Sequence, residues 1–150
     1  MPSLSVHSPL GPLTITEQDA VIVSLGWGWS RESEETGLLC LARDQLDAYF
    51  NGAREGFRLP LAPPGSAFQR SVWSRMISIP YGDTESYGAV AAAVGSAPRA
   101  VGSACAANPI PILIPCHRVV GKGGALTGYS GAEGIGSKHY LLQLESGLPV

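Results

Sequence analysis

The stretch SYGAVAAAVGSAPRAVGSACAANP, residues 86–109, carries the clearest indication of the fold. Alanine-rich runs lie on both sides of Gly95-Ser96-Ala97-Pro98, a combination that ends one helix and begins the next. These are the proportions of a helix-turn-helix, with Arg99 opening the second helix. The pattern alone favours an ordinary helical hairpin, in which alanine simply permits close packing, over a DNA-binding motif.

The segment that follows leads directly to a cysteine. NPIPILIPC, residues 108–116, has prolines at 109, 111 and 115, so we expect an extended, buried connector. IPCHRVVG, residues 114–121, then places Cys116 before His117 and Arg118. A buried structural thiol is one interpretation, and a nucleophile activated by a neighbouring base is the other. Adjacent residues of extended chain point to opposite faces, so Cys116 and His117 can cooperate only through a turn or a water.

Working outward, the remaining segments predict two small domains. LTIT and AVIVSL, within residues 9–25, read as a β-hairpin, and residues 42–52 read as a helix that stops at Asn-Gly. The Pro/Gly-rich APPGS, residues 62–66, predicts a boundary between domains 1–62 and 63–150. Beyond it we expect an amphipathic helix over residues 66–79 and a closing helix from about Ser137 to Glu145. Glu145, in the last turn, is one candidate carboxylate for orienting the His117 imidazole.

Composition limits the possible functions. The net charge of −2 shows no excess of basic residues that would indicate a polyanionic partner. Any contact with nucleic acid must therefore be confined to a small part of the surface. Three cysteines without CxxC spacing argue against a disulfide framework and a zinc site, and Cys40 with His7 is too small a ligand set. The cysteines thus lead us to expect no metal and a reducing, cytoplasmic location. We expect no membrane segment, because no apolar run approaches the length needed to cross a bilayer.

The motifs together resemble a known family. Asn108-Pro109 followed by Pro115-Cys116-His117-Arg118-Val119 is similar to the active-site signature of the O6-alkylguanine-DNA alkyltransferases, or methylated-DNA-protein-cysteine methyltransferases. QLDAYFNG, FRLPL, FQRSVW, IPYGDTESYG, RAVGSACAANP, GYSG and KHYLLQLE follow in the order of that family, so the resemblance covers nearly the whole chain. It implies an N-terminal α/β, ribonuclease H-like domain with a short antiparallel sheet. The C-terminal domain would be mainly helical, with a winged-helix-like helix-turn-helix.

The resemblance implies DNA repair by irreversible, stoichiometric transfer of an alkyl group from O6-alkylguanine to Cys116, without a cofactor. In family terms His117 takes the thiol proton through a water, Glu145 steers His117, and Asn108 braces the turn. Tyr87 matches the donor to the departing guanine. A polarisable sulfur suits attack on saturated carbon, and the thioether product has no easy leaving group, so each molecule should act once.

The resemblance also implies a partner, double-stranded DNA containing the lesion and bound through its minor groove by a monomer. Because the base cannot be reached inside a duplex, it must be flipped out, and Arg99 matches the residue that takes its place in the stack. The expected contacts to DNA or to the base come from the second helix and from the segment after the thiol. They are Arg99, Ala100, Gly102, Ser103, Arg118, Val119, Tyr129 and Ser130.

Two rival functions remain open at this stage. A lesion-binding sensor would keep the DNA-binding frame, although the relatives of that kind replace the cysteine that is present here. A thiol hydrolase using Cys116, His117 and Glu145 would turn over repeatedly on a small ester or peptide.

Overall fold

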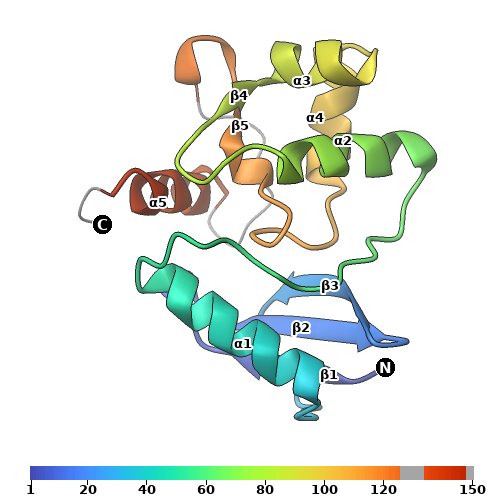
Figure 1. Cartoon of the computed structure of the whole chain (residues 1–150), viewed down its shortest axis with the longest axis vertical. Helices are drawn as coiled ribbons and strands as arrows, with labels where there is room; N and C mark the ends of the chain where they lie inside the picture. The colour runs from blue at the N-terminus through green and yellow to red at the C-terminus, as the bar shows by residue number, and fades with distance from the viewer. Residues whose placement is uncertain (126–133, 148–150) are drawn as a thin grey trace. The chain divides into compact units, whose positions relative to one another are not determined.

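The computed structural model describes residues 1–125 and 134–147, leaving aside the side chain of residue 135. The chain divides into two compact units, Met1–Pro64 and Gly65–Val150 (Figure 1). The elements follow in the order β1 (Ser3–Val6), β2 (Leu13–Gln18), β3 (Val21–Trp27), α1 (Gly37–Phe50), α2 (Ala67–Ile77), β4 (Glu85–Ser86), α3 (Tyr87–Val94), α4 (Pro98–Ala106), the 3-10 turn η1 (Cys116–Arg118), β5 (Val119–Val120), the 3-10 turn η2 (Lys122–Gly124) and α5 (Ile135–Glu145).

The first unit is a three-stranded antiparallel sheet, ordered β1-β2-β3, with α1 packed against β1 and β2 (Figure 1). The predicted hairpin is β2–β3, and it turns through Asp19 and Ala20, which both have positive φ. Leu13, Ile15 and Ile22 are fully buried, so alternate residues of the strands face the core. The fold class predicted from the sequence is therefore confirmed for this half of the chain.

Residues 57–61 follow α1 as the predicted extended segment, and they reach the edge of the sheet. The amide of Ile22 donates to the carbonyl of Pro60 at 2.9 Å, and the amide of Ala62 donates to the carbonyl of Ile22 at 2.9 Å. Helix α1 begins at Gly37 rather than at residue 42, because Thr36 caps it by accepting a hydrogen bond from the amide of Leu39.

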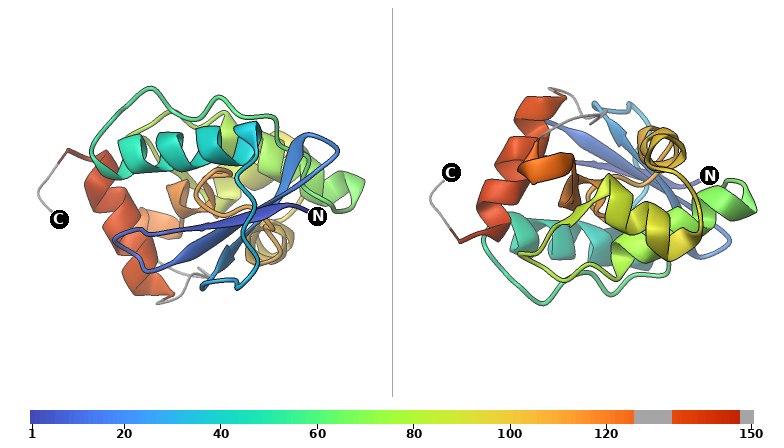
Figure 2. Two further views of the ribbon diagram at one scale, coloured as in Figure 1. Left: turned by 90° about the horizontal axis from the view of Figure 1, so that it is seen from below. Right: turned by 90° about the horizontal axis from the view of Figure 1, so that it is seen from above.

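The second unit is mainly helical, as predicted. Helices α2, α3 and α4 pack on one another, and Figure 2 shows α3 and α4 as two short consecutive helices. Ser66 and Gln69 form a reciprocal capping box at the start of α2, and Gly95 ends α3 in the left-handed conformation. Val72, Trp73 and Met76 are the buried face of α2.

One aromatic side chain links the start of this unit to α4. The indole N–H of Trp73 donates to the carbonyl of Ala104 at 2.8 Å in a buried position. The ring also lies close to Gly65, where an added Cβ would be 2.5 Å from the indole Cη2. Glycine at this position therefore permits the close approach of the ring.

A short parallel ladder brings two distant segments of the second unit together. Glu85 pairs with Val119 and Ser86 with Val120, so β4 and β5 are neighbours (Figure 1). Because α3 begins directly after β4 and η1 ends directly before β5, the ladder places the start of α3 beside the segment that carries Cys116. None of the described helices is both long enough and apolar enough to span a membrane.

Candidate active site

The candidate nucleophile, Cys116, lies at the start of η1 on a tightly wound loop. The amide of Cys116 donates to the carbonyl of Ile114 at 2.8 Å, and only 5 % of the residue surface is exposed. The 3-10 turn changes the chain direction at the cysteine, so the opposite-face argument for extended chain no longer applies to Cys116 and His117.

Asn108 holds this loop from within. Its side-chain amide donates to the carbonyl of Ile114 at 3.0 Å, and its side-chain oxygen accepts from the amide of Ile110 at 2.9 Å. The predicted extended connector is therefore wrong in shape, although its burial is confirmed. Ile112 turns the chain at φ 73°, a conformation that a β-branched residue rarely adopts, and the residues around it are buried.

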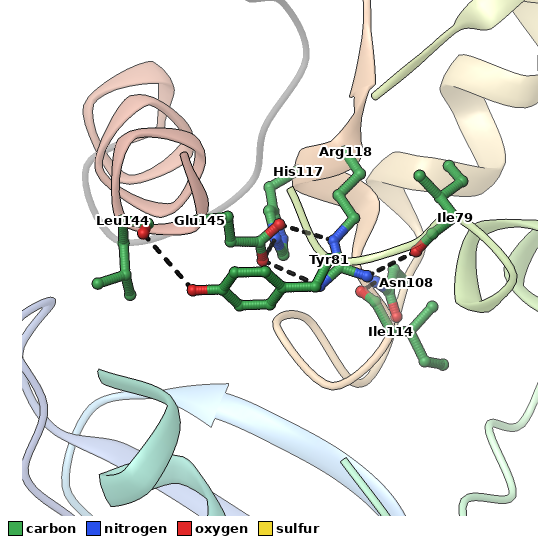
Figure 3. A network of polar contacts seen from close by, with 8 residues as sticks. All are labelled: Ile79, Tyr81, Asn108, Ile114, His117, Arg118, Leu144 and Glu145. Carbon is green, nitrogen blue, oxygen red and sulfur yellow. Dashed lines mark hydrogen bonds and ion pairs between the residues drawn. The ribbon is translucent and has the colours of Figure 1, made fainter. Parts of the chain in front are cut away.

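His117 is fully buried and bonded to the end of α5. Its Nε2 lies 2.6 Å from Oε2 of Glu145, as Figure 3 shows. A carboxylate only accepts hydrogen bonds, so Nε2 carries the proton of the neutral imidazole and Nδ1 is left as an acceptor. No protein group among the described residues bonds to Nδ1. The structure thus brings together His117 and Glu145, which the sequence alone could only name as candidates. Nδ1 of His117 remains available to accept a proton.

Burial is the main reason why the imidazole of His117 stays neutral. Burial lowers the pKa of His117, the hydrogen bond and the charge of Glu145 raise it, and the charges of Arg118 and Lys138 lower it. The net direction is downward, so at neutral pH the ring is a base that can still accept a proton.

Arg118 differs from the expectation that it contacts DNA. Its Nε donates to Oε1 of Glu145 at 2.8 Å, its Nη2 donates to Oε2 at 3.0 Å, and its Nη1 donates to the carbonyl of Ile79 at 2.7 Å (Figure 3). Only 10 % of the side-chain surface is exposed. The guanidinium is therefore used inside the protein, where it neutralises a buried carboxylate.

The thiol itself is protonated in the resting protein. Burial raises the pKa of Cys116, while the hydrogen bond from Asn108 and the positive charge of Lys138 act in the opposite direction. Because the net direction is upward, a base must remove the proton when the sulfur reacts.

Lys138 is the residue that sequence reasoning missed. Lys138 is only 1 % exposed, and burial lowers its pKa. Its Nζ lies 3.4 Å from the hydroxyl oxygen of Tyr87 and 5.5 Å from the centre of that ring. The available signal was helical spacing, since Lys138, Leu141 and Glu145 share one face of α5 and all three are buried.

The second helix of the predicted pair, α4, has one buried and one accessible face. Arg99 and Ser103 are exposed, and Ala100 and Gly102 are half-buried. Val101, Ala104 and Cys105 form the buried face, with the sulfur of Cys105 3.7 Å from that of Met76. The predicted DNA-contacting residues of this helix therefore lie on the outward side, where a ligand can reach them.

The remaining predicted residues lie in different surroundings. Tyr87 is the first residue of α3 and is half-buried, and Val119 is fully buried in β5. Tyr129 and Ser130 lie outside the described residues. Within residues 1–125 and 134–147, no group of three or more histidine, cysteine, aspartate or glutamate side chains could hold a metal ion.

Comparison with protein families matches both units. Residues 4–63 match the 6-O-methylguanine DNA methyltransferase ribonuclease-like domain, and residues 67–147 match the DNA-binding domain of the same proteins. The chain belongs to the 6-O-methylguanine DNA methyltransferase family. It is a methylated-DNA-protein-cysteine methyltransferase that repairs O6-methylguanine.

Individual methyltransferases resemble the chain over nearly its whole length. It is 44 % identical to the constitutive methylated-DNA-protein-cysteine methyltransferase of Bacillus subtilis, covering 94 % of this chain and 93 % of that one. It is 51 % identical to the Methanosarcina acetivorans methyltransferase, covering 93 % and 94 %. The crystal structure of Mycobacterium tuberculosis OGT in complex with DNA superposes with a TM-score of 0.89 at 40 % identity, covering 100 % of this chain and 96 % of that one.

Proposed function

We propose that this methyltransferase removes the alkyl group of O6-alkylguanine in DNA by transferring it irreversibly to Cys116, once per molecule. The observation that carries the proposal is the buried His117–Glu145 pair at 2.6 Å, next in the chain to Cys116, with an acceptor nitrogen that no described protein group occupies. A thiol that is protonated at rest needs such a base when it attacks.

The proposed step is a displacement at saturated carbon. The proton of the Cys116 thiol passes through a water to Nδ1 of His117, and the sulfur forms a bond to the alkyl carbon. The bond between that carbon and O6 breaks, and its electron pair stays with the guanine. The purine gains a proton in return, so the overall products are the S-alkyl cysteine and unmodified guanine.

Tyr87 is the proposed donor of the proton that guanine receives. Its hydroxyl lies beside the Lys138 ammonium, whose charge stabilises negative charge that develops on the phenolic oxygen. The β4–β5 ladder brings the start of α3, and so Tyr87, beside the segment that carries Cys116. The hydrogen bond from Asn108 to the carbonyl of Ile114 stabilises the turn in that segment. These residues would then act on the base and the sulfur in one site.

The proposed partner is double-stranded DNA, bound through the minor groove by the outward face of α4. A similar solved structure, of Mycobacterium tuberculosis OGT, is in complex with DNA. The segment Gly65–Val150 carries six Lys and Arg against four Asp and Glu, so the positive excess lies in the half that matches the DNA-binding domain. Small side chains on α4 suit close approach to the groove.

Base flipping would present the lesion to the thiol, with Arg99 taking its place in the stack. Arg99 is exposed at the start of α4, so its guanidinium can enter DNA without disturbing the core. Flipping costs a few kcal/mol, which the inserted side chain helps to offset. We further propose that Tyr129, the backbone of Ser130 and the carbonyls of Cys116 and Val119 line the base pocket.

Three general features complete the proposal. The transfer needs no cofactor, because the sulfur supplies the nucleophile and the chain supplies the base and the acid. A monomer carries all the proposed residues. Cys40, Cys105 and Cys116 are free thiols, which fits a reducing compartment such as the cytoplasm.

Intact mass spectrometry tests the proposed function. The protein is incubated with a duplex oligonucleotide containing O6-methylguanine, and we expect a gain of one methyl group per molecule, mapped by peptide analysis to Cys116. Cys116→Ser is the matched control and should bind the duplex without gaining mass. Binding by the native protein without a mass change would instead indicate a lesion sensor, and repeated turnover of a small ester or peptide without methylation would indicate a hydrolase.

A further inference from the structure

We propose that Arg118 is a positioning residue for the transfer reaction, which fixes the Glu145 carboxylate and thereby holds His117 as a neutral base with its proton on Nε2. This inference rests on the proposed function, because it assigns the residue that prepares His117 for taking the thiol proton. It also replaces the role in DNA contact that the sequence suggested for Arg118.

The geometry of the guanidinium carries the proposal. Its Nε and Nη2 donate to the two different oxygens of Glu145, at 2.8 and 3.0 Å, so the carboxylate cannot rotate without losing a bond. The third nitrogen, Nη1, donates to the carbonyl of Ile79 at 2.7 Å, which ties the arginine to the chain after α2. Figure 3 shows the arginine between Ile79 and Glu145.

One carboxylate oxygen accepts from both Arg118 and His117. Oε2 of Glu145 accepts from Nη2 of Arg118 and lies 2.6 Å from Nε2 of His117. A carboxylate already neutralised by arginine stabilises an imidazolium less than a carboxylate that faces histidine alone. Arg118 therefore holds the Glu145 carboxylate in place as a hydrogen-bond acceptor for His117, while the imidazole stays neutral.

Burial and the charge of Lys138 act on the pKa of His117 in the same direction as Arg118, and Glu145 acts against them. The charged groups that act on the ring are Glu145 and Lys138 from α5 and Arg118 from η1. Lys138 lies against Tyr87, with its Nζ 3.4 Å from the hydroxyl oxygen. The Tyr81 ring packs beside Arg118, with its centre 5.8 Å from the guanidinium carbon.

The test compares Arg118→Met, which removes the charge, with Arg118→Lys, which keeps it but loses the two-pronged geometry. Single-turnover methyl transfer from an O6-methylguanine duplex is measured from about pH 6 to about pH 9, across the range where histidine titrates. With Arg118→Met we expect the acid limb of the rate profile to move to higher pH, because the pKa of His117 rises. The rate should fall by more than about fivefold near pH 6.5 and less than about twofold near pH 9. Arg118→Lys should keep the acid limb in its native position.

Other outcomes overturn the proposal. Equal loss of rate at every pH in both variants would show a packing role alone, and an unshifted limb in Arg118→Met would show that the charge does not act on His117. Weaker binding of the duplex by Arg118→Met in a Cys116→Ser background, with an unshifted limb, would favour contact with DNA. If Arg118→Met does not fold, Arg118→Gln keeps an amide donor without the charge and takes its place.

A measurement on the native protein separates this inference from the proposed function. Nitrogen-15 NMR of the histidine side chains should show His117 as the Nε2–H tautomer at neutral pH. A protonated ring or the Nδ1–H tautomer would overturn the inference even if the mass experiment places a methyl group on Cys116. Failure of methyl transfer with the expected tautomer present would instead contradict the proposed function.

Discussion

The ammonium group of Lys138 lies 3.4 Å from the phenolic oxygen of Tyr87, although the two residues are 51 positions apart in the chain. The same lysine lowers the pKa of Cys116, against the larger opposite effect of burial. One buried cation thus acts on both groups that we assign to the reaction, the nucleophile and the proton donor.

Replacing Lys138 with methionine should weaken the nucleophile while keeping the shape of the side chain. Without the positive charge the pKa of Cys116 rises further, so the thiolate fraction falls. We expect alkylation of Cys116 by iodoacetamide at neutral pH to slow by roughly two- to tenfold, as is usual for loss of a nearby charge in a partly buried site. Peptide mapping separates Cys116 from Cys40 and Cys105. Lys122→Met, at an exposed position, is the control, and equal rates in the two variants would contradict the assignment.

Arg99→Ala tests the insertion of a side chain into DNA. Arg99 is exposed, so we expect the melting temperature of the variant to stay unchanged. Methyl transfer from a duplex should slow, because no side chain then offsets the free-energy cost of flipping the base. Transfer from the same lesion in a single strand, where the base is already unpaired, should change much less. Equal slowing on both substrates would mean that Arg99 acts only through general attraction to phosphate.

Gly102→Ala tests how closely α4 approaches DNA. An added Cβ at Gly102 meets nothing within 4 Å, so the protein itself accommodates the methyl group. Because alanine favours a helix over glycine by about 1 kcal/mol, we expect a higher melting temperature. Duplex binding, measured by fluorescence anisotropy at fixed salt, should nevertheless weaken. Unchanged affinity would show that this part of the helix does not face the groove.

The buried neutral state of His117 predicts a pH dependence of stability. Its pKa is lowered on folding, so the unfolded chain binds a proton more readily, and the stability conferred by the neutral ring is lost as the pH falls below about 6.5. The slope from this residue is at most about 1.4 kcal/mol per pH unit. The free energy of unfolding in urea is measured for the native protein and for His117→Gln at two pH values. Comparison of the two proteins separates the contribution of His117 from those of the carboxylates and the other histidines. A parallel pH dependence in both proteins would contradict the prediction.

Alkylation of Cys116 should lower the stability of the fold. The residue is 5 % exposed, and its loop is held by the two hydrogen bonds of Asn108, so an added methyl group crowds a packed turn. Overfilling such a site costs about 1–3 kcal/mol. Differential scanning calorimetry of free and methylated protein measures the change, and an equal or higher melting temperature after methylation would refute it.

Local sequence patterns were sufficient to predict the helices whose capping residues and apolar face are both visible in the sequence. Helix α2 has Ser66 and Gln69 at its start and an apolar face of Val72, Trp73 and Met76, so the sequence places it to within a few residues. Helices α3 and α4 were predicted equally well, because Gly95 and Pro98 are the residues that end and begin helices.

Pairing between distant segments was not predictable in this way. The two-residue strands β4 and β5 are too short to show alternation, and β1 was not recognised as a strand. The loop before Cys116 was predicted as extended because its prolines exclude a helix. Its actual turn depends on Asn108, whose bonds reach across six residues to Ile114. Local propensity carries no information about such a contact.

The burial of two cations was not predictable for a related reason. Lysine and arginine are almost always solvated, so a single sequence favours the surface for Arg118 and Lys138. Their burial depends on partners: Glu145 and Ile79 for Arg118, and Tyr87 for Lys138. The resemblance to a family supplied Cys116, His117 and Glu145 as a set, whereas the arginine between them became visible only with the coordinates.

The ring of Trp73 occupies the space beside Gly65 and holds the carbonyl of Ala104, so it spans from the first residue of the C-terminal unit to α4. A side chain at position 65 would have to displace the indole, which is hydrogen-bonded to the helix that bears Arg99. The absence of a side chain just after the boundary between the two units is therefore coupled, through a single ring, to the packing of the helix that we propose for the minor groove.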